Sequence, residues 1–347
     1  MPSRAAARAP QRNGALRLPE HAQQALVVVD DQPLNLTHLD KAYFPDGTSK
    51  RDLLEYSFDV APFLLPYLRD RPYTMKRFPN GIEAPAFFQK DAAGKVPAWV
   101  RTVAMPSGNE RGVVHYVLCN DTATLLYLVN LGCIDHNVGL SRVTLTGAGP
   151  HSAARSDPRT TPLAPDFVLL DLDPGPKAGF DRVVKVAQII REVLDQCEIA
   201  GYPKTSGATG MHIWIPIGPG HTFEQTQRLA ALLLRLASLR APELMTEVWR
   251  IAARPADRVY LDFRQNANGK TIPPPYSPRP RPGAPVSCPL QWSEVRASLD
   301  PVRFNIRTMR RRLDRWGDLF APTLPGQRHD SLQNMLRRLE KCHAEAA

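Results

Sequence analysis

The chain has 347 residues, enough for one large domain or two closely packed ones. Its 44 lysines and arginines outnumber its 34 acidic residues, which leaves a formal net charge of +10. That surplus favours a polyanionic partner, although it is also typical of a well-solvated surface. No apolar run approaches the roughly 18 residues of a membrane span, and no secretory signal is evident. We therefore expect a cytoplasmic protein with no membrane partner.

The five cysteines are scattered and form no CxxC pair or Cys/His cluster. This argues against a disulfide framework and against a zinc site. Reduced, mostly buried thiols are the expectation.

The first half of the chain predicts a small α/β module behind a basic arm. Residues 1–25 carry several arginines and no apolar segment, and we expect them to be disordered. Folded sequence begins near Leu26, and a capping box at Ser49 predicts the start of a helix. Residues 82–130 predict short strands and a second helix. The polar stretch 142–165 predicts a surface connection between two halves.

In the second half, strands and helices alternate, which predicts an α/β layer with the helices packed on one sheet. In chain order we expect a strand at 166–173, a helix at 181–197, a strand at 211–217, a helix from Thr222 to 239 and a strand at 258–263.

A proline-rich segment follows, with eight prolines among the 17 residues from Pro273 to Pro289. Proline cannot donate to a strand ladder, so an extended loop is expected there, either ordered or flexible. A surface helix is expected at the C-terminus. The predicted division of the chain is a basic arm at 1–25, an N-terminal α/β module at 26–160, a catalytic module at 161–300 and a C-terminal helical extension at 301–347.

Two acids, Asp171 and Asp173, stand at positions i and i+2 of the 166–173 strand and share one of its faces. Carboxylates about 4 Å apart repel by about 4 kcal/mol at an effective dielectric of about 20, so a divalent cation or a shared proton is expected. Oxygen-only ligands favour Mg²⁺ or Mn²⁺. A DxD alone also occurs in turns, at helix caps and in sugar-nucleotide transferases.

A third acid ends another predicted strand. In the segment RVYLDF, Asp262 shares a face with Tyr260, away from the apolar Val259 and Leu261. An acid among apolar residues needs a partner. That partner is either the same cation or a neighbouring arginine in a salt bridge.

Between the acidic strands lies the glycine turn KTSGATGMH. Gly207 and Gly210 permit a tight turn, Ser206 begins it, and His212 lies on the following strand. Free N–H groups, a hydroxyl and an imidazole can cradle a triphosphate, and Lys204 adds a cation whose direction strand alternation leaves open. A glycine hairpin without function is the alternative. The turn is not a P-loop, because no GK[ST] is present.

Several other side chains suit a nucleic-acid partner. Lys50 and Arg51 occupy the first turn of the predicted helix, where free N–H groups and two cations can bind an anion. Phe87 and Phe88 cannot both face inward on a strand, so one is expected to be free to stack on a base. Solvated surface cations and core phenylalanines are the alternatives.

The proline-rich segment presents Arg279 and Arg281 at i and i+2. The surrounding prolines stiffen that segment, so little ordering entropy remains to be lost on binding DNA. A Pro/Arg linker is the alternative.

Taken together and in order, the segments LTHLDKAYFPDGTSK, MKRFPNG, FFQK, IDHNVGLSR, DLDPGP, KTSGATGMH and YSPRPRPG resemble the archaeo-eukaryotic primase superfamily. Within it, residues 33 to 320 are similar to the polymerase domain of bacterial ligase D and its stand-alone relatives. The resemblance implies an α/β (α+β) primase-polymerase fold: a mixed central sheet with an RRM-like catalytic module and an N-terminal α/β module that contacts the template and a 5′-phosphate.

The resemblance also implies a role for each matching position. It assigns catalysis and metal binding to Asp171, Asp173 and Asp262, nucleotide binding to His136, Ser206, Gly207, His212, Arg254 and Lys76, template stacking to Phe87 and Phe88, 5′-phosphate and DNA contacts to Lys41, Lys50 and Arg51, and DNA or nucleotide contacts to Arg279 and Arg281.

The implied function is template-dependent addition of nucleotides at DNA ends or short gaps during bacterial repair, by two-metal phosphoryl transfer with Mn²⁺ or Mg²⁺. NTPs or dNTPs are the implied substrates, with a preference for ribonucleotides. The implied partners are DNA with a 5′-phosphate, a Ku-type end-binding protein and a separate DNA ligase, which places the protein at the nucleoid. The alternatives are a metal-dependent sugar-nucleotide transferase and a non-catalytic DNA-end-binding module.

Three positions depart from the family pattern. Ala208-Thr209 stand where Gly-Lys is frequent, so one cation beside the phosphates is missing. His38 stands where Asn is frequent. The loop between Lys41 and Lys50 is one residue shorter than usual.

Overall fold

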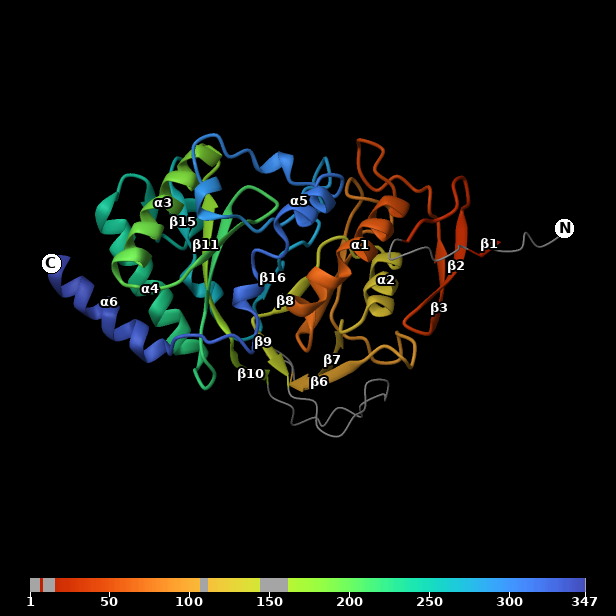
Figure 1. Cartoon of the computed structure of the whole chain (residues 1–347), viewed down its shortest axis with the longest axis horizontal. Coiled ribbons are helices and arrows are strands. Elements are labelled where there is room, and N and C mark those ends of the chain that lie inside the picture. Colours follow the sequence, from red (N-terminus) through yellow and green to blue (C-terminus); the bar gives the residue numbers. More distant parts are fainter. Residues whose placement is uncertain (1–6, 9–15, 107–111, 144–161, 347) are drawn as a thin grey trace.

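The computed structural model describes residues 7–8, 16–106, 112–143 and 162–346, and its helices and strands form two adjoining α/β layers (Figure 1). The α-helices are α1 (Lys50–Leu68), α2 (Thr122–Asn130), α3 (Phe180–Gln196), α4 (Phe223–Arg240), α5 (Met309–Trp316) and α6 (Leu332–Ala346). A separate three-stranded sheet is formed by β1 (Ala7–Arg8), β2 (Gln24–Val29) and β3 (Gln32–Thr37). The strands of the first layer are β4 (Pro72–Arg77), β5 (Phe87–Gln89), β6 (Thr102–Pro106), β7 (Val113–Leu118), β8 (Asn137–Gly139) and β16 (Thr271–Ile272). The remaining strands are β9 (Ser141–Val143), β10 (Pro162–Pro165), β11 (Phe167–Pro174), β12 (Tyr202–Thr205), β13 (Met211–Pro216), β14 (Met245–Thr246) and β15 (Val259–Leu261). The predicted α/β (α+β) class is confirmed.

The first layer is a sheet of order β16-β8-β4-β7-β6, with β5 added to β4. One face of this sheet carries Tyr73, Met75, Val117 and Val138, which join the main core together with the buried residues of α1 and α2. The division of the chain predicted from sequence differs here. β16, placed in the catalytic module, pairs antiparallel with β8, because the chain returns to the first layer after β15.

The second layer is a mixed sheet of order β12-β13-β11-β15-β14, in which only the β14–β15 pairing is parallel. Strand alternation gives it two unlike faces. Helices α3 and α4 cover one of them (Figure 1). On the other, the ring of Phe167 stacks on that of Trp214 with centroids 3.8 Å apart, and Trp214 meets Tyr67 of α1 edge to face. The acid-bearing face of this sheet therefore looks toward the first layer.

The local signals for helix starts are confirmed. Ser49 and Asp52 form a capping box at α1, and Thr222 and Gln225 form another at α4. In both, the side-chain oxygen accepts a hydrogen bond from one of the backbone amides that a helix start leaves unpaired.

The ends of the chain differ from prediction. Leu16 and Leu18 are buried, and the amide of Leu18 donates to Glu55 Oε1 at 2.8 Å, so the predicted disordered arm is wrong for residues 16–25. Polar contacts with α1 hold this segment, since Arg17 also lies 3.6 Å from Asp59 Oδ2. Most of 1–15 lies outside the described residues. Phe320, in the predicted extension, is buried against Tyr67 and Trp214.

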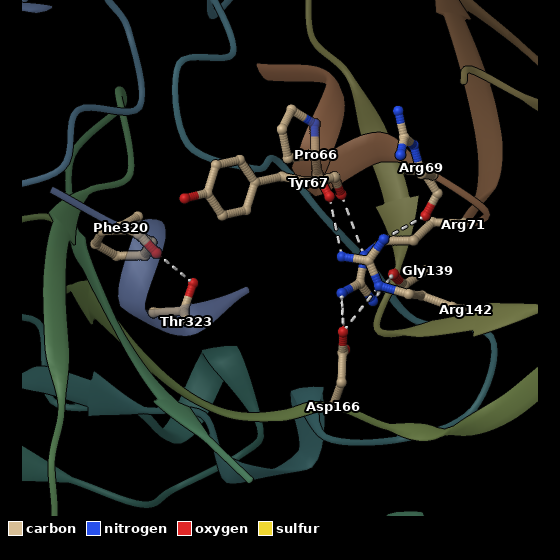
Figure 2. A network of polar contacts seen from close by, with 9 residues as sticks. All are labelled: Pro66, Tyr67, Arg69, Arg71, Gly139, Arg142, Asp166, Phe320 and Thr323. Atoms are coloured by element: carbon tan, nitrogen blue, oxygen red, sulfur yellow. Dashed lines mark hydrogen bonds and ion pairs between the residues drawn. The ribbon is translucent and has the colours of Figure 1, made fainter. Parts of the chain in front are cut away.

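A charged network joins the two layers near the start of β11 (Figure 2). Arg71 is buried, and its Nη2 donates to Asp166 Oδ1 and Oδ2 at 2.7 and 2.6 Å. Arg142 Nε donates to Asp166 Oδ2 at 3.1 Å, while its Nη atoms donate to the carbonyls of Arg69 and Pro66. Asp166 thus links the second sheet to the end of α1 and to β9.

Candidate active site

The three acids come together on the face of the second sheet that looks toward the first layer. In the antiparallel β11–β15 register Asp173 lies opposite Tyr260, which sets Asp171 opposite Asp262. The amide of Asp262 donates to the carbonyl of Asp171 at 3.0 Å. Because side chains alternate along a strand, all three carboxylates project from one face, as the sequence predicted.

Their electrostatics show how close the carboxylates are. Burial, followed by the charges of Asp173 and Asp262, raises the pKa of Asp171 well above its usual range. Burial and Asp262 likewise raise the pKa of Asp173. The folded protein therefore disfavours three negative charges here, and a bound cation would offset that repulsion.

The donor set fits Mg²⁺ or Mn²⁺, which prefer carboxylate oxygens. Among the described residues, no three His, Cys, Asp or Glu side chains are arranged to hold one metal ion as they stand. Asp262 Oδ1 accepts a hydrogen bond from the amide of Arg264 at 3.0 Å, which leaves Oδ2 for another partner. The oxygen donors of the three carboxylates and their mutual repulsion fit a divalent cation, although their side chains as oriented here do not converge on one ion.

A buried row of polar side chains runs behind the acids. Cross-strand pairing sets Lys204 beside His212, and His212 beside Asp171. Lys204 Nζ lies 2.8 Å from His212 Nδ1, and His212 Nε2 lies 3.4 Å from Asp171 Oδ1. Strand alternation alone left the direction of Lys204 open; it lies on the same face of the sheet as His212 and Asp171 and points along this row.

Burial governs the charge of this row. Desolvation, followed by the charges of neighbouring cations, lowers the pKa of Lys204 well below its usual range, and also that of His212. Lys204 Nζ also donates to the carbonyl of Pro273 and to Ser287 Oγ, so the lysine is fixed by the proline-rich segment.

The glycine turn has a tighter structure than the sequence implied. Ser206 Oγ accepts hydrogen bonds from the amides of Ala208 and Gly210, both at 3.1 Å, so those two N–H groups are not free for a phosphate. Gly207 has φ +71°, and a Cβ on it would lie 2.6 Å from Arg279 Cγ. A Cβ on Gly210 would lie 2.1 Å from the carbonyl oxygen of Leu172. Both positions require glycine because the backbones approach so closely.

Two arginines border the acids. Arg279 Nη1 donates to the carbonyl of Ser206 at 2.8 Å, and its Nε is buried with no hydrogen-bond partner in the described part of the chain. Arg254 lies over the ring of Tyr260 at 3.5 Å, and its positive charge lowers the pKa of Asp173 against the effect of burial. These cations therefore stand beside the cluster of negative charge without neutralising it.

His136 immediately precedes β8 in the first layer and contacts the proline-rich segment. Its Nδ1 is 2.8 Å from the hydroxyl of Tyr73, and its amide donates to Ser277 Oγ at 3.0 Å. Its Nε2 is buried without a partner among the described residues, as is Oδ1 of the adjacent Asp135. Burial lowers the pKa of Arg279, and the charges of Asp135, Asp171 and Asp173 oppose that shift, so Asp135 acts on the same arginine as the acids. Buried unpaired polar atoms are costly, so their concentration here indicates a polar ligand.

The three residues predicted to contact a phosphate near the start of α1 have different surroundings in the structure. Lys50 is buried, and desolvation together with the charge of Lys41 lowers its pKa to about 8. Lys41 Nζ donates to Asn80 Oδ1 at 2.7 Å. Arg51 is held by Asp40 at 2.6 Å and by the carbonyls of Pro19 and Ala22. Arg51 therefore stabilises the fold, and only the two lysines remain in the candidate anion site.

Phe87 and Phe88 lie on the edge strand β5, and both are exposed, at 46% and 62%. Arg77 lies over the first ring at 5.3 Å, and Lys76 over the second at 5.6 Å. We expected one exposed ring, and both are exposed. Among the described strands β5 pairs only with β4, so its outer side is uncovered. Lys76, predicted to bind nucleotide, lies beside Phe88.

Arg281 is exposed on the outer side of the proline-rich segment, and its amide donates to the carbonyl of Arg279 at 2.8 Å. Sequence reasoning missed Tyr73, Ser277 and Tyr260. The hydroxyl of Tyr260 is also buried without a hydrogen-bond partner among the residues that the structure describes. No local pattern distinguishes these residues from ordinary core residues.

Comparison with known proteins agrees with this geometry. The model of the LigD, primase-polymerase domain family matches residues 49–320. The bifunctional non-homologous end joining protein LigD of Bacillus subtilis is 32% identical over 310 residues, which cover 89% of this chain and 47% of that protein. The multifunctional non-homologous end joining protein LigD of Mycolicibacterium smegmatis is 29% identical over 292 residues, covering 83% and 36%. The chain thus spans less than half the length of these two relatives.

A solved structure is similar throughout the fold. The polymerase domain from Mycobacterium tuberculosis Ligase D in complex with DNA is 28% identical, with a TM-score of 0.73, and the match covers 83% of this chain and 96% of that one. In the described part of this chain no helix is both long and apolar enough to cross a membrane. The family match over most of the chain, on a fold that gathers the three acids, establishes that the chain belongs to the LigD primase-polymerase domain family of nucleotidyltransferases.

Proposed function

We propose that this chain extends a primer on a DNA template at double-strand ends or short gaps during repair, by metal-dependent nucleotidyl transfer. The observation that carries the proposal is the gathering of Asp171, Asp173 and Asp262 on one sheet face, within electrostatic range of Arg279, whose buried Nε lacks a partner among the described residues. The solved relative was obtained in complex with DNA, and the curated relatives are end-joining proteins, which supports the same setting.

Asp171, Asp173 and Asp262 would hold two Mg²⁺ or Mn²⁺ ions. Such ions activate a primer 3′-hydroxyl and neutralise charge on the triphosphate and on the leaving pyrophosphate. The polypeptide's own part is to position the substrates and to stabilise charge.

The residues around the acids would orient the incoming NTP or dNTP. Burial lowers the pKa of His136 to about 3, so its imidazole is neutral at pH 7 and can donate from Nε2 without carrying charge. Arg254 and Arg279 would meet phosphate oxygens. Ser206 would donate its own hydroxyl proton, since its oxygen already accepts from two amides. His212 and Gly207 would shape the floor beneath the phosphates.

Removing the hydroxyl of Tyr73 tests this arrangement. In Tyr73→Phe the ring still fills its buried position, but Nδ1 of His136 loses its partner and the imidazole can rotate. We expect KM for the nucleotide to rise about five- to tenfold, the value of one hydrogen bond, with little change in kcat. Steady-state extension kinetics measure both constants. Tyr127→Phe, at a half-buried tyrosine whose ring packs edge to face on Trp99, is the control, and an unchanged KM in Tyr73→Phe would contradict the role.

At the far side of a gap, Lys41 and Lys50 would hold the 5′-phosphate, with the N-terminus of α1 adding its free amides. Lys50 is suited to this because its buried charge lacks an anionic partner among the described residues. A phosphate dianion would supply that partner. Phe87 and Phe88 would stack on template bases, and Arg281 would contact the DNA backbone.

Replacing this lysine should separate stability from recognition. Because burial lowers the Lys50 pKa to about 8, the folded state disfavours its charge, and Lys50→Met should raise the free energy of unfolding at pH 7. The same change should abolish the preference for 5′-phosphorylated gaps. In the native chain that preference should decline as the pH rises above about 8. Competition binding with phosphorylated and unphosphorylated duplexes measures it, with exposed Lys185→Met as control; an unaltered preference would reject the assignment.

The wider setting is proposed on the same basis: a Ku-type end-binding protein and a DNA ligase as partners, and ribonucleotides as favoured substrates. The decisive assay is primer extension on a 5′-phosphorylated gapped duplex with Mn²⁺ or Mg²⁺ and NTPs or dNTPs. Extension that follows the template supports the polymerase. DNA binding without extension would support an end-binding module, and transfer from a sugar nucleotide would support the glycosyl alternative.

A further inference from the structure

Helix α5 lies beside α1 and runs from the start of α1 toward its end (Figure 1). Just before α5, Arg307 Nη2 donates to Thr48 Oγ1 at 2.8 Å, and Arg307 Nη1 lies 3.5 Å from Asp46 Oδ2. Just after α5, Asp318 Oδ2 accepts a hydrogen bond at 2.7 Å from the hydroxyl of Tyr67, near the end of α1. Thr48 stands two residues before the buried lysine of the candidate 5′-phosphate site. The first turn of α5 therefore lies close to that site, and the rest of α5 leads away from it.

The outward side of α5 is lined with arginines. Met309 and Leu313 are buried and fix which side of the helix meets the core. Positions four apart share one side of a helix, so Arg311 and Arg315 lie in line, and Arg307 precedes them at the same spacing. All three side chains are exposed, and we call them the α5 arginine stripe. Four residues rise about 6 Å along a helix, and one DNA strand carries a phosphate about every 3.4 Å of its axis, so each arginine can reach a phosphate of its own.

Acidic side chains neutralise little of this charge. Asp314 is the one acid of α5, and it pairs with Arg310 Nε at 3.2 Å. Within the described ranges of the chain, neither Arg311 nor Arg315 has an ion-pair partner. Arg310, Arg311 and Arg312 also occupy the first turn of α5, which contains no acid. Like charges four residues apart, and cations in the first turn of a helix, both destabilise that helix. A bound polyanion would offset this repulsion.

We propose that the α5 arginine stripe binds the phosphate backbone of the duplex on the far side of the gap, which we call the distal duplex. DNA whose 5′-phosphate occupies the candidate site would meet Arg307 first and Arg315 last, because α5 leads away from that site. Backbone contacts carry no sequence information, so the stripe would hold a distal duplex of any sequence. The inference rests on the proposed polymerase function and adds a DNA contact outside the active site.

The first test compares two gapped DNAs that carry the same 5′-phosphate. In one the distal duplex is long, and in the other it is cut back to its first few base pairs and closed by a hairpin loop. Loss of one phosphate contact on duplex DNA reduces the slope of log K against log salt by about 0.9, or about fivefold in affinity near 0.15 M salt. Arg311→Gln and Arg315→Gln should each lose that much on the long arm and keep native affinity on the short arm. Arg235→Gln, at an exposed arginine of α4, is the matched control. Equal losses on both DNAs, or losses no larger than that of the control, would overturn the proposal.

The second test locates the contact. A methylphosphonate replaces one phosphate of the distal duplex at a time, on either strand, and removes its charge without changing the sequence. In the native chain we expect at least one position to weaken binding about fivefold. At that position Arg311→Gln should cause no further loss, because the two changes remove the same contact. Additive losses at every position would overturn the proposal.

Binding is measured without nucleotide, so the contact is read separately from nucleotide addition. A native chain that shows this coupling but extends no primer would refute the polymerase function and keep the stripe. A native chain that extends primers but shows no coupling would refute the stripe alone.

Discussion

Asp171→Asn is expected to abolish primer extension while leaving the fold as stable as, or more stable than, the native chain. The substitution keeps the shape of the side chain and removes one negative oxygen from the metal site. A divalent cation contributes several kcal/mol of transition-state stabilisation, so a loss of about 4 kcal/mol, on the order of 10³-fold in rate, is expected. Single-turnover extension on a gapped duplex with saturating Mn²⁺ measures it.

The stability of the same variant gives an independent readout. Since burial and like charges raise the pKa of Asp171, the folded state binds a proton there more readily than the unfolded state. The contribution of this group to the free energy of unfolding therefore falls as the pH rises above its ordinary value of 3.8. Asp171→Asn should flatten that dependence in metal-free buffer, as measured by urea unfolding at pH 5 and pH 7.

The matched control is Asp195→Asn on α3. Asp195 is 69% exposed, and its contact with Arg191 is a surface pair worth at most about 1 kcal/mol. This variant should extend primers at the native rate with native stability. Native-rate extension by Asp171→Asn would refute the metal role. If Asp171→Asn loses activity because it unfolds, the same extension assay on Asp173→Asn tests the role of the carboxylates instead.

Asp166→Ala is expected to have the largest effect on stability. Asp166 neutralises Arg71, of which only 2% is exposed, and it also holds Arg142 (Figure 2). Removing one partner of a buried ion pair leaves an uncompensated charge and typically costs about 3–5 kcal/mol. We expect a loss of that size in the free energy of unfolding, measured by urea denaturation at pH 7.

Two further variants show whether the loss comes from the orphaned charge. Arg71→Met added to Asp166→Ala should recover part of the stability, because the buried cation is then gone. Glu340→Ala, which removes an exposed partner of Arg228, should change stability by less than about 1 kcal/mol. If Asp166→Ala lowers the free energy of unfolding by no more than Glu340→Ala does, the network does not hold the two layers together.

The network also predicts an acid limit. The two arginines lower the pKa of Asp166 below 3.8 despite its burial. The stabilisation from ionised Asp166 is complete at pH values above the pKa of this group in the unfolded chain. It is lost as the pH falls from that pKa through the lower pKa of the folded protein. Acid unfolding of the native chain should therefore steepen below about pH 4, and Arg71→Met with Asp166→Ala should lack that component.

The sequence by itself determined the parts of this protein that depend on short-range rules. The alternation in FVLLDLDP set Asp171 and Asp173 on one face, and the same rule in VYLD oriented Asp262. The capping boxes at Ser49 and Thr222 fixed where α1 and α4 begin. Each rests on backbone geometry within a few residues, which sequence spacing reports directly.

Only the tertiary structure decided which polar side chains are buried and what they contact. Lys50 and Arg51 are neighbours in one helical turn, yet the first is buried without an anionic partner among the described residues and the second is held by Asp40. Lys204 lies beside His212 and is fixed there by the proline-rich segment, and Tyr73 reaches His136 across neighbouring strands. The contacts of Lys204 with Pro273 and of Tyr73 with His136 join residues 69 and 63 positions apart in the sequence. Burial and charge depend on such long-range packing, to which no local periodicity responds.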